Sequence, residues 1–263
     1  MGAVSSQPYE VYAIKYARHE RNASQNFISS DLHEGSMPMD YFIWVVRNAD
    51  RTIVVDTGFG RSVAEQRKRE FLRCPVASLE LLDIDVNDVE DVIITHMHYD
   101  HVGNFDLFPR ARFHLQDREM NYATGRYMCH ACLRSAYEPD DVAEMVKKVY
   151  QERVEFHDGD HVLFPGVSLH LAGGHTNGLQ FVRVWTQKGW LVLASDASHY
   201  YANMESGNPF PLVFNVGDML EAQKRLYRLA DSPELVVPGH DPAVFERFPA
   251  ASPSLEGIIL RLA

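Results

Sequence analysis

Residues 95–104 read Thr-His-Met-His-Tyr-Asp-His-Val-Gly-Asn and place four candidate metal ligands within six positions: His96, His98, Asp100 and His101. Imidazole nitrogen and carboxylate oxygen at this density are typical of sites for Zn²⁺ or another first-row metal, and the two halves of the cluster can face two ions. The apolar run 92–94 before it predicts a buried strand, and Gly103 permits a tight turn. We therefore expect the cluster on a loop at a strand end, where active-site residues are common.

A lone histidine in a loop is usually a hydrogen-bonded polar residue, so the cluster has to be weighed against that interpretation. Several titratable groups packed together destabilise a fold unless a cation compensates them. Four potential ligands directly after an apolar strand therefore predict a metal site rather than plain scaffold.

Strands and helices alternate along the chain. We expect strands at 11–14, 41–46, 52–55, 92–94, 112–115, 167–171, 180–185, 190–194 and 235–237, and helices at 61–72, 116–134, 140–152 and 216–230, with a short helix that has Asp88 in its first turn. No linker or low-complexity break divides the chain. The pattern predicts an α/β protein, an αββα sandwich of two mixed sheets face to face with helices outside, formed by residues 1–263 as one domain with a helical segment at about 116–152.

Composition limits the classes of partner. The 263 residues are 46% apolar and carry 25 basic against 36 acidic side chains, a net charge of −11. An acidic surface disfavours nucleic acid, so a neutral or weakly charged small molecule is the expected substrate. No signal segment or run of eighteen apolar residues is evident, which predicts a cytoplasmic protein without membrane contact. Cys129 and Cys132 are expected to be reduced, buried helix thiols.

Three further strand-end loops each offer a potential ligand. His175 stands in Gly-Gly-His-Thr-Asn-Gly, Asp196 in Ala-Ser-Asp-Ala, and His240 in Pro-Gly-His-Asp. The order His-x-His-x-Asp-His, Gly-His-Thr, a lone Asp after a strand and Gly-His resembles the metallo-β-lactamase superfamily of hydrolases from about Asp56 to His240. The fold expected from the strand pattern agrees with this resemblance.

The resemblance implies two metal sites. His96, His98 and His175 would hold one metal, Asp100, His101 and His240 would hold the other, and Asp196 would bridge the pair. Two Zn²⁺ ions are the implied cofactors, with other divalent first-row metals as alternatives. Asp56 resembles the aspartate that orients a ligand histidine, although a turn-making aspartate explains the same spacing.

Within the superfamily, the chain resembles the N-acyl homoserine lactonases. The supporting segments are residues 16–21, 40–42 and 54–59 and the helical stretch after His114. This likeness implies a small lactone or ester as substrate, a role in quorum quenching and a homodimer. Those lactonases place a tyrosine three residues after the bridging aspartate, where this chain has His199 followed by Tyr200 and Tyr201. Either His199 or Tyr200 would replace that tyrosine, or the substrate differs.

The implied chemistry is attack of a metal-bridging hydroxide on a lactone carbonyl, with Asp100 carrying the proton to the leaving oxygen and His199 as a second catalytic candidate. Alternatives are a glyoxalase-like thioester hydrolase, another small-ester hydrolase, or a non-catalytic metal-binding module. A basic patch near the motifs would favour the thioester, and the sequence shows no clear one. The other histidines are expected to be surface or hydrogen-bonded polar residues: His19, His33, His114, His130, His157, His161 and His170.

Overall fold

Two stacked β-sheets form the centre of the computed structural model, which describes residues 7–30 and 35–263; His33 lies outside these residues. The larger sheet has the strand order β13 (Ile259–Arg261), β1 (Glu10–His19), β2 (Met39–Arg47), β3 (Thr52–Val55), β5 (Asp91–Ile93), β6 (Arg112–Gln116), β7 (Val154–His157), and β4 (Glu70–Phe71) pairs with β1. The smaller sheet has the order β12 (Val236–Pro238), β11 (Gly189–Ser195), β10 (Gln180–Thr186), β9 (Val167–Leu171), β8 (His161–Phe164).

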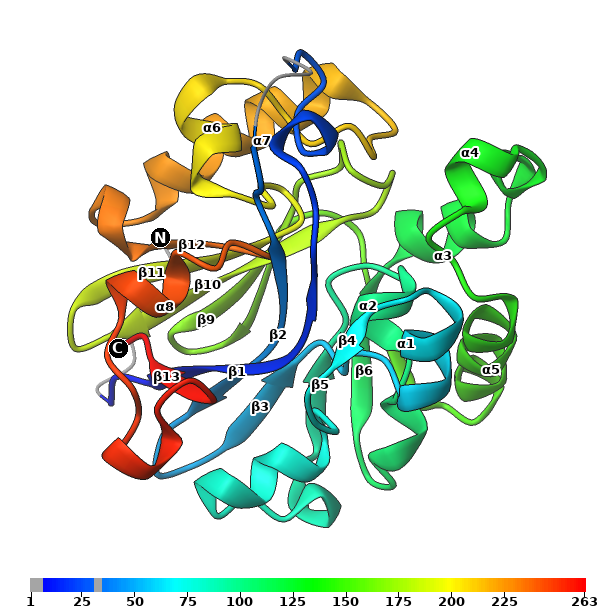
Figure 1. Cartoon of the computed structure of the whole chain (residues 1–263). Coiled ribbons are helices and arrows are strands. Elements are labelled where there is room, and N and C mark those ends of the chain that lie inside the picture. The colour runs from blue at the N-terminus through cyan, green and yellow to red at the C-terminus, as the bar shows by residue number, and fades with distance from the viewer. Residues whose placement is uncertain (1–6, 31–34) are drawn as a thin grey trace.

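Helices cover the outer faces of both sheets (Figure 1). On the larger sheet they are α1 (Arg61–Gln66), α2 (Tyr99–Val102), α3 (Asp117–Ala123) and α5 (Pro139–Tyr150), with 3₁₀ turns at Ala77–Leu82 and Val86–Asp88. The short helix α4 (Ala131–Arg134) lies beyond α3, away from the sheet. On the smaller sheet they are α6 (Tyr201–Ser206), α7 (Val216–Leu229) and α8 (Val244–Arg247). The predicted αββα sandwich of two mixed sheets is confirmed. Within the described residues, no helix has the length and apolar character needed to cross a membrane.

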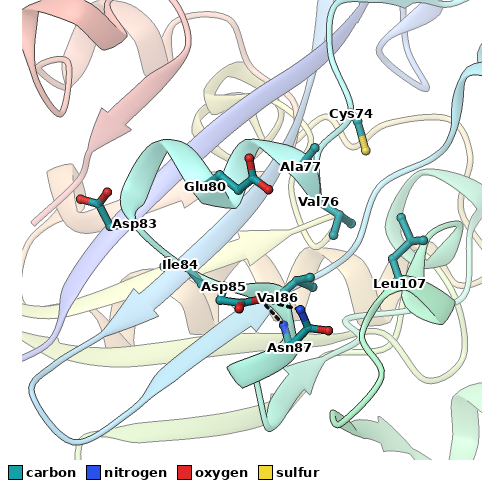
Figure 2. Close-up of a pocket in the computed structure, with 10 residues that line it drawn as sticks. All are labelled: Cys74, Val76, Ala77, Glu80, Asp83, Ile84, Asp85, Val86, Asn87 and Leu107. Atoms are coloured by element: carbon teal, nitrogen blue, oxygen red, sulfur yellow. Dashed lines mark hydrogen bonds between the residues drawn. The ribbon is translucent and has the colours of Figure 1, made fainter.

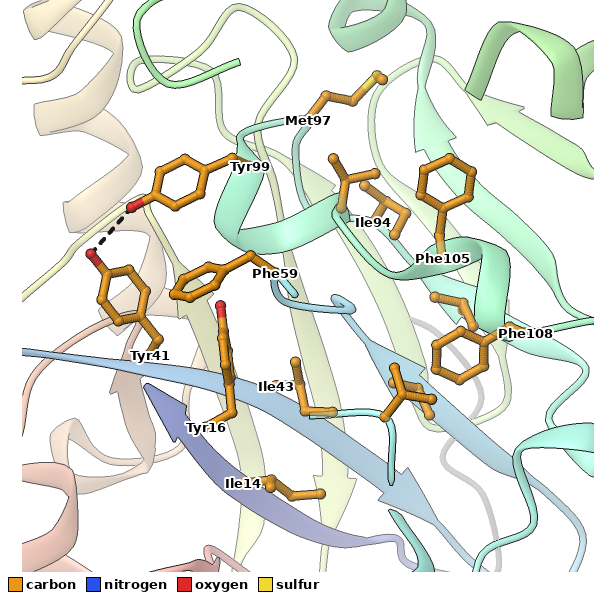
Figure 3. Close-up of a cluster of buried hydrophobic side chains, with 14 of the residues drawn as sticks. Ile14, Tyr16, Tyr41, Ile43, Phe59, Ile94, Met97, Tyr99, Phe105 and Phe108 are labelled. Atoms are coloured by element: carbon orange, nitrogen blue, oxygen red, sulfur yellow. Dashed lines mark hydrogen bonds between the residues drawn. The ribbon is translucent and has the colours of Figure 1, made fainter. Parts of the chain in front are cut away.

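The core lies in two layers, because strand side chains alternate between the two faces of the larger sheet. Val11, Phe42 and Trp44 point toward the smaller sheet. Ile14 and Ile43 point toward the helices, where they join the cluster drawn in Figure 3. Both faces of the larger sheet are therefore buried, which explains why its strands read as continuous apolar runs.

The sheet topology places the loops that follow the parallel strands at one edge of each sheet. Strands β3, β5, β6 and β7 run parallel to one another, and β11 is parallel to β12 in the facing sheet. The carboxyl ends of parallel strands meet at the same edge, which is where ligands bind in open α/β sheets. The motif at 95–104 leaves β5 at this edge.

Three local predictions are wrong. The helix expected at 61–72 ends at Gln66, since Lys68 adopts a left-handed conformation with φ of 55° and the chain then pairs with β1 as β4. The helix expected at 116–134 breaks near Gly125, where an added Cβ would lie 2.5 Å from the carbonyl oxygen of Asn121. Cys129 and Cys132 are exposed rather than buried.

Candidate metal centre

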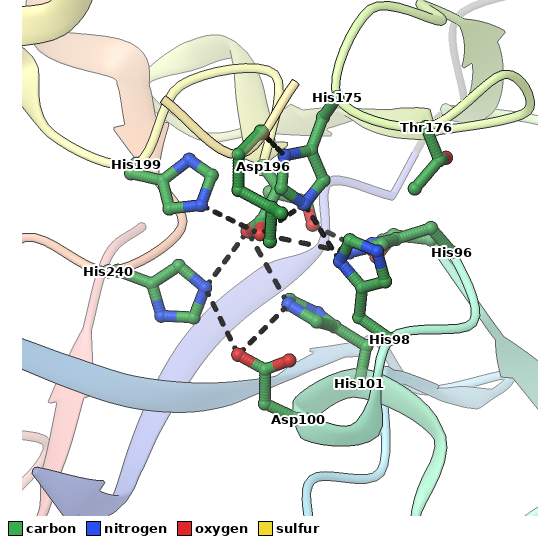
Figure 4. Close-up of polar contacts among 12 residues, drawn as sticks. His96, His98, Asp100, His101, His175, Thr176, Asp196, His199 and His240 are labelled. Carbon is green, nitrogen blue, oxygen red and sulfur yellow. Dashed lines mark hydrogen bonds and ion pairs between the residues drawn. The ribbon is translucent and has the colours of Figure 1, made fainter. Parts of the chain in front are cut away.

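Four strand-end loops bring the seven candidate ligands together (Figure 4). His96 and His98 follow β5, Asp100 and His101 lie in α2, His175 follows β9, Asp196 follows β11, and His240 follows β12. All seven side chains are buried. The structure therefore assembles the predicted constellation, and the assignment of each residue as a ligand stays a prediction.

The first group consists of three histidines and one carboxylate oxygen. The Nδ1 atom of His98 lies 3.1 Å from Nε2 of His96 and 2.9 Å from Nε2 of His175. The Oδ2 atom of Asp196 lies 3.1 Å from Nε2 of His175 and 3.7 Å from Nε2 of His96. Three imidazole nitrogens and Oδ2 thus converge on one point.

The second group uses the other oxygen of the same aspartate. Oδ1 of Asp196 lies 2.9 Å from Nε2 of His240 and 3.4 Å from Nε2 of His101. Oδ2 of Asp100 lies 3.7 Å and 3.8 Å from the same two nitrogens. Asp196 therefore faces both groups, one oxygen to each, as a bridging carboxylate would.

Hydrogen bonds on the far nitrogens set the direction of three rings. The Nδ1 atom of His101 donates to Asp56 over 2.7 Å, that of His240 to the carbonyl of Asp40 over 2.9 Å, and that of His175 to the carbonyl of Leu212 over 2.7 Å. Each bond directs Nε2 into the cluster, where a neutral ring offers its lone pair. Asp56 is held by Thr95, whose backbone nitrogen and hydroxyl each donate to its carboxylate over 2.8 Å.

The donor set fits two first-row metal ions. Three of its buried atoms have no hydrogen-bond partner: Nε2 of His101, Nε2 of His240 and Oδ1 of Asp196. Leaving such atoms unpaired is costly in a native fold unless a ligand satisfies them. Ligands held about 2.0–2.1 Å from a tetrahedral zinc lie roughly 3.3 Å apart, close to the nitrogen separations in the first group.

The electrostatics favour ligation as well. Burial, reinforced by the neighbouring histidines, lowers the pKa of His96 and His98 well below the usual value, so both rings are neutral and offer a lone pair. Burial opposes protonation of His101 too, but the carboxylates of Asp196, Asp56 and Asp100 raise its pKa well above the ordinary value. This concentration of carboxylates around His101 is the environment that a cation compensates.

Glu119, which the sequence analysis did not single out, connects the loops of the first group. Oε1 accepts from the backbone nitrogen of Met97 over 3.0 Å and the hydroxyl of Tyr137 over 2.9 Å. Oε2 accepts from the hydroxyl of Thr176 over 2.6 Å and the backbone nitrogen of Gly178 over 3.1 Å. Met97 stands between two candidate ligands and Thr176 follows a third, so this buried carboxylate fixes the distance between their loops.

His199 contacts Asp196, whereas the two tyrosines after it point elsewhere. Nε2 of His199 lies 3.1 Å from Oδ2 of Asp196, and its ring stacks on Phe210 with centroids 3.7 Å apart. Burial lowers the pKa of His199 to about 3. The hydroxyl of Tyr200 instead donates to the carbonyl of Pro38 over 3.3 Å, and Tyr201, the first residue of α6, packs into the buried cluster around the smaller sheet.

A pocket of 280 Å³ opens above the cluster. Its lining includes His98, Asp100, Asp196, His199, His240, Tyr41, Tyr99, Phe210, Arg21, Arg67 and Arg69. A wider pocket of 640 Å³ lies beside the 3₁₀ turns at Ala77–Leu82 and Val86–Asp88 (Figure 2). None of the His/Cys/Asp/Glu groups that could hold a metal in the described chain lies in that wider pocket. The 280 Å³ pocket is therefore the candidate substrate site.

The remaining buried histidines have hydrogen-bond partners, as expected of satisfied polar residues. His114 contacts Asp91 over 2.9 Å and His157 over 3.2 Å at the edge of the larger sheet, and His170 contacts Asp160 over 3.0 Å.

Comparison with known families places the chain. Residues 38–240 match the metallo-beta-lactamase superfamily. The chain belongs to this superfamily, and it is a metal-dependent hydrolase with a metal-binding His/Asp cluster of the kind found in dinuclear members.

Individual relatives are distant. A probable metallo-hydrolase of Mycobacterium tuberculosis is 25% identical over 239 residues, which cover 78% of this chain and 75% of that protein. An N-acyl homoserine lactonase of Bacillus cereus is 28% identical over 168 residues, covering 63% and 61%. The crystal structure of a quorum-quenching N-acyl homoserine lactone lactonase superposes with a TM-score of 0.74 at 22% identity, covering 92% of this chain and 95% of that one. The dizinc quorum-quenching lactonase AidC superposes with a TM-score of 0.69 at 17% identity, covering 89% and 88%.

Proposed function

We propose that this protein is a dinuclear-zinc hydrolase that opens a small lactone. The observation that carries the proposal is the bridging position of Asp196, whose two oxygens face two separate groups of imidazole nitrogens. His96, His98 and His175 would hold one ion, and Asp100, His101 and His240 the other. When bound, the ions supply an activated water and Lewis acidity at neutral pH. The dizinc relative supports the choice of metal, and the lactonase relatives support the choice of substrate.

Asp100 is the proposed proton carrier. Its carboxylate lies at the pocket wall between the second metal group and the space above it. A carboxylate in this position can take a proton from the attacking water and return it to the leaving ring oxygen. Its peptide carbonyl accepts a hydrogen bond from the hydroxyl of Tyr16 over 2.8 Å, which holds the first turn of α2 in place.

His199 is the proposed positioning residue for the bridge. As a neutral ring it donates from Nε2 to Asp196, and Phe210 supports it from the other face. This contact keeps the carboxylate plane aligned with both metal groups.

Tyr41 is the proposed replacement for the tyrosine that lactonases carry after the bridging aspartate. Its hydroxyl lies 3.2 Å from that of Tyr99 (Figure 3). The hydroxyl of Tyr99 accepts a hydrogen bond from Nε of Arg69 over 3.1 Å. Either hydroxyl can donate in this pair, and with Tyr99 as the donor the proton of Tyr41 is available to a substrate carbonyl in the pocket. Burial and nearby Asp100 raise the pKa of Tyr41 well above the usual value, so this donor keeps its proton.

A thioester hydrolase is the second candidate function, because three arginines line the pocket. A charged thiol carrier would be recognised by such groups. A proton-release assay separates the candidates when it compares acyl homoserine lactones, γ- and δ-lactones, aryl esters and acidic thioesters. Ring opening of lactones at rates above those of the thioesters supports the proposal, whereas hydrolysis of thioesters alone overturns it.

A further inference from the structure

Arg69 presents an unneutralised positive charge to the candidate substrate pocket. One terminal nitrogen donates to the carbonyl of Arg67 over 2.8 Å and contacts Nε2 of His19 at 3.1 Å, and Nε donates to Tyr99. All these acceptors are neutral. Within residues 7–30 and 35–263, no carboxylate lies within ion-pair distance of this guanidinium.

Arg21 lies on the same pocket wall. It donates to the side chain of Asn26 over 2.6 Å and to the carbonyl of Gln25 over 2.7 Å. Its guanidinium stands over the ring of Phe210, 5.1 Å from the centroid, and Phe210 in turn stacks on His199. Arg21 is therefore one aromatic ring away from the side chain that contacts the bridging aspartate.

The guanidiniums of Arg69 and Arg21 both lower the pKa of the same neighbouring side chain, His19. Burial first, and then the charges of Arg69 and Arg21, lower the pKa of His19 to about 4. A neutral His19 can accept the hydrogen bond from Arg69, which agrees with the contact between them. The wall thus gathers two like charges around a ring that stays uncharged.

Arg67, the third arginine of the pocket, differs from Arg69 and Arg21 because it forms an ion pair with a carboxylate. Its Nε donates to the carboxylate of Glu138 over 2.7 Å, and a terminal nitrogen donates to the carbonyl of Ser135 over 2.9 Å. Its charge is neutralised and its donors are used within the protein. Arg69 and Arg21 differ because, among residues 7–30 and 35–263, their hydrogen bonds go to neutral groups.

Half-buried like charges repel each other and lose hydration unless an anion joins them. The carboxylates of Asp100 and Asp196 in the same pocket do not serve this purpose, since the proposed function commits them to metal ions. A planar guanidinium fork matches a carboxylate with two parallel hydrogen bonds. The volume of 280 Å³ is at the small end of the range for ligand pockets, which favours a compact substrate over a long acyl chain.

We propose that Arg69 and Arg21 form a carboxylate-binding subsite, so that the substrate of this hydrolase is a compact lactone or ester that carries a carboxylate. The inference rests on the proposed function and names its substrate class. It narrows the neutral or weakly charged substrate expected from the net charge of −11 to an anionic one, because the charge of the pocket wall is opposite to that of the whole chain.

The test compares two γ-lactones that differ in one group: a ring carboxylate and the corresponding primary amide. We expect kcat/KM to be about tenfold to a hundredfold higher for the carboxylate, the range for a charge-assisted hydrogen bond. Rising salt should lower kcat/KM for the carboxylate and leave that for the amide unchanged, because screening weakens only the charged encounter.

Three variants locate the effect. Arg21→Gln should raise KM for the carboxylate lactone while kcat and the metal content change little. Arg69→Gln should raise the same KM, and the loss of its bond to Tyr99 should lower kcat equally for the two lactones. Arg69→Lys should restore part of the loss in KM. Arg61→Gln is the matched control. Arg61 lies in α1, where its guanidinium stands over the ring of Phe71, and it is not among the residues that line the pocket. Equal kcat/KM for the two lactones, or a preference that survives in both glutamine variants, overturns the subsite but leaves the lactonase proposal intact.

A binding measurement keeps the two proposals separable if neither lactone is opened. That result would overturn the lactonase proposal. The subsite then stands if the carboxylate lactone raises the melting temperature of the zinc-loaded wild type but not of Arg69→Gln, and it fails if the carboxylate and the amide give equal shifts.

Discussion

The carboxylate of Glu119 accepts four hydrogen bonds and joins the loops after β5 and β9. Its loss should therefore shift the candidate metal ligands on these loops, which it does not contact itself. In Glu119→Gln, the amide nitrogen faces two of the four donors and cannot accept from either of them. We expect the free energy of unfolding to fall by about 2–4 kcal/mol and zinc affinity to fall about 10- to 100-fold. Chemical denaturation and a competitive zinc chelator measure the two effects. Glu256→Gln, at an exposed position, is the control and should change neither.

Tyr41 and Tyr200 provide a matched pair for the donor proposed to polarise the substrate carbonyl. Tyr41→Phe should lower kcat about tenfold to a hundredfold with two metal ions still bound, because one hydrogen bond to the developing oxyanion is lost. Tyr200→Phe removes the bond to Pro38 and should cost about 1 kcal/mol of stability without changing kcat. Steady-state kinetics on both variants decide the matter, and a larger kinetic loss in Tyr200→Phe would assign the role to Tyr200.

Single residues were predictable where a motif named them. The His and Asp side chains of the cluster stand in short patterns whose chemistry can be read directly. Glu119 and Arg69 have no such pattern, since an acidic residue at the start of a helix and an arginine among charged neighbours are typical of solvated surface. Only the tertiary fold brings Glu119 against Gly178, where an added Cβ would lie 2.0 Å from the backbone nitrogen of Glu119.

At the level of elements, His19 at the carboxyl end of β1 makes the free energy of unfolding depend on pH. Its pKa is about 4 in the folded chain and about 6.5 when unfolded, so the unfolded state binds more protons between these values. The stability from neutral His19 is complete above pH 6.5 and is lost as the pH falls toward 4. We expect the metal-free wild type to lose about 1–2 kcal/mol more than His19→Asn over this range, allowing for solvent screening.

Urea unfolding at several pH values in the presence of a chelator measures this difference. Asparagine retains an acceptor for Arg69 but does not titrate, which isolates the protonation effect. His130→Asn, at an exposed position in the same chain, should follow the wild type. Parallel pH profiles for the wild type and His19→Asn would contradict the expected contribution.

Helices and strands were predictable from hydrophobic periodicity where residues at both ends of the element also favoured its start and its end. The helix expected at 216–230 is found as α7, and Asn215 caps it by accepting from the backbone nitrogen of Asp218. The strand β8 was not predicted, because two of its four residues are exposed and it is specified by pairing with β9 rather than by its own pattern. The helical prediction at 61–72 failed for the same reason, since pairing with β1 overrides the helix propensity around β4.

For the whole molecule, metal ions should be part of the stability of the fold. The two metal groups join loops from both sheets, and without a ligand several of their buried atoms lack partners. Ions bind the folded chain and stabilise it by RT ln(1 + [L]/Kd), about 2.7 kcal/mol at a hundredfold excess over Kd. Chelation should lower the melting temperature by several degrees, and added zinc should restore it. An unchanged melting temperature after verified metal loss would show that the loops are organised without ions.

The overall architecture was predictable because each candidate ligand motif follows directly after an apolar run that predicts a strand. Apolar runs that end at ligand motifs indicated two sheets with a common edge, and the loops meet there. The charge of the pocket was not predictable from composition, because net charge averages over the surface while Arg21 and Arg69 come together from segments far apart in the sequence.

Metal analysis of the purified protein tests the dinuclear centre most directly. We expect close to two equivalents of zinc per chain in the wild type, and close to one in His101→Ala, which loses a ligand of the second group only. A single equivalent in the wild type, or one iron in place of zinc, would contradict it.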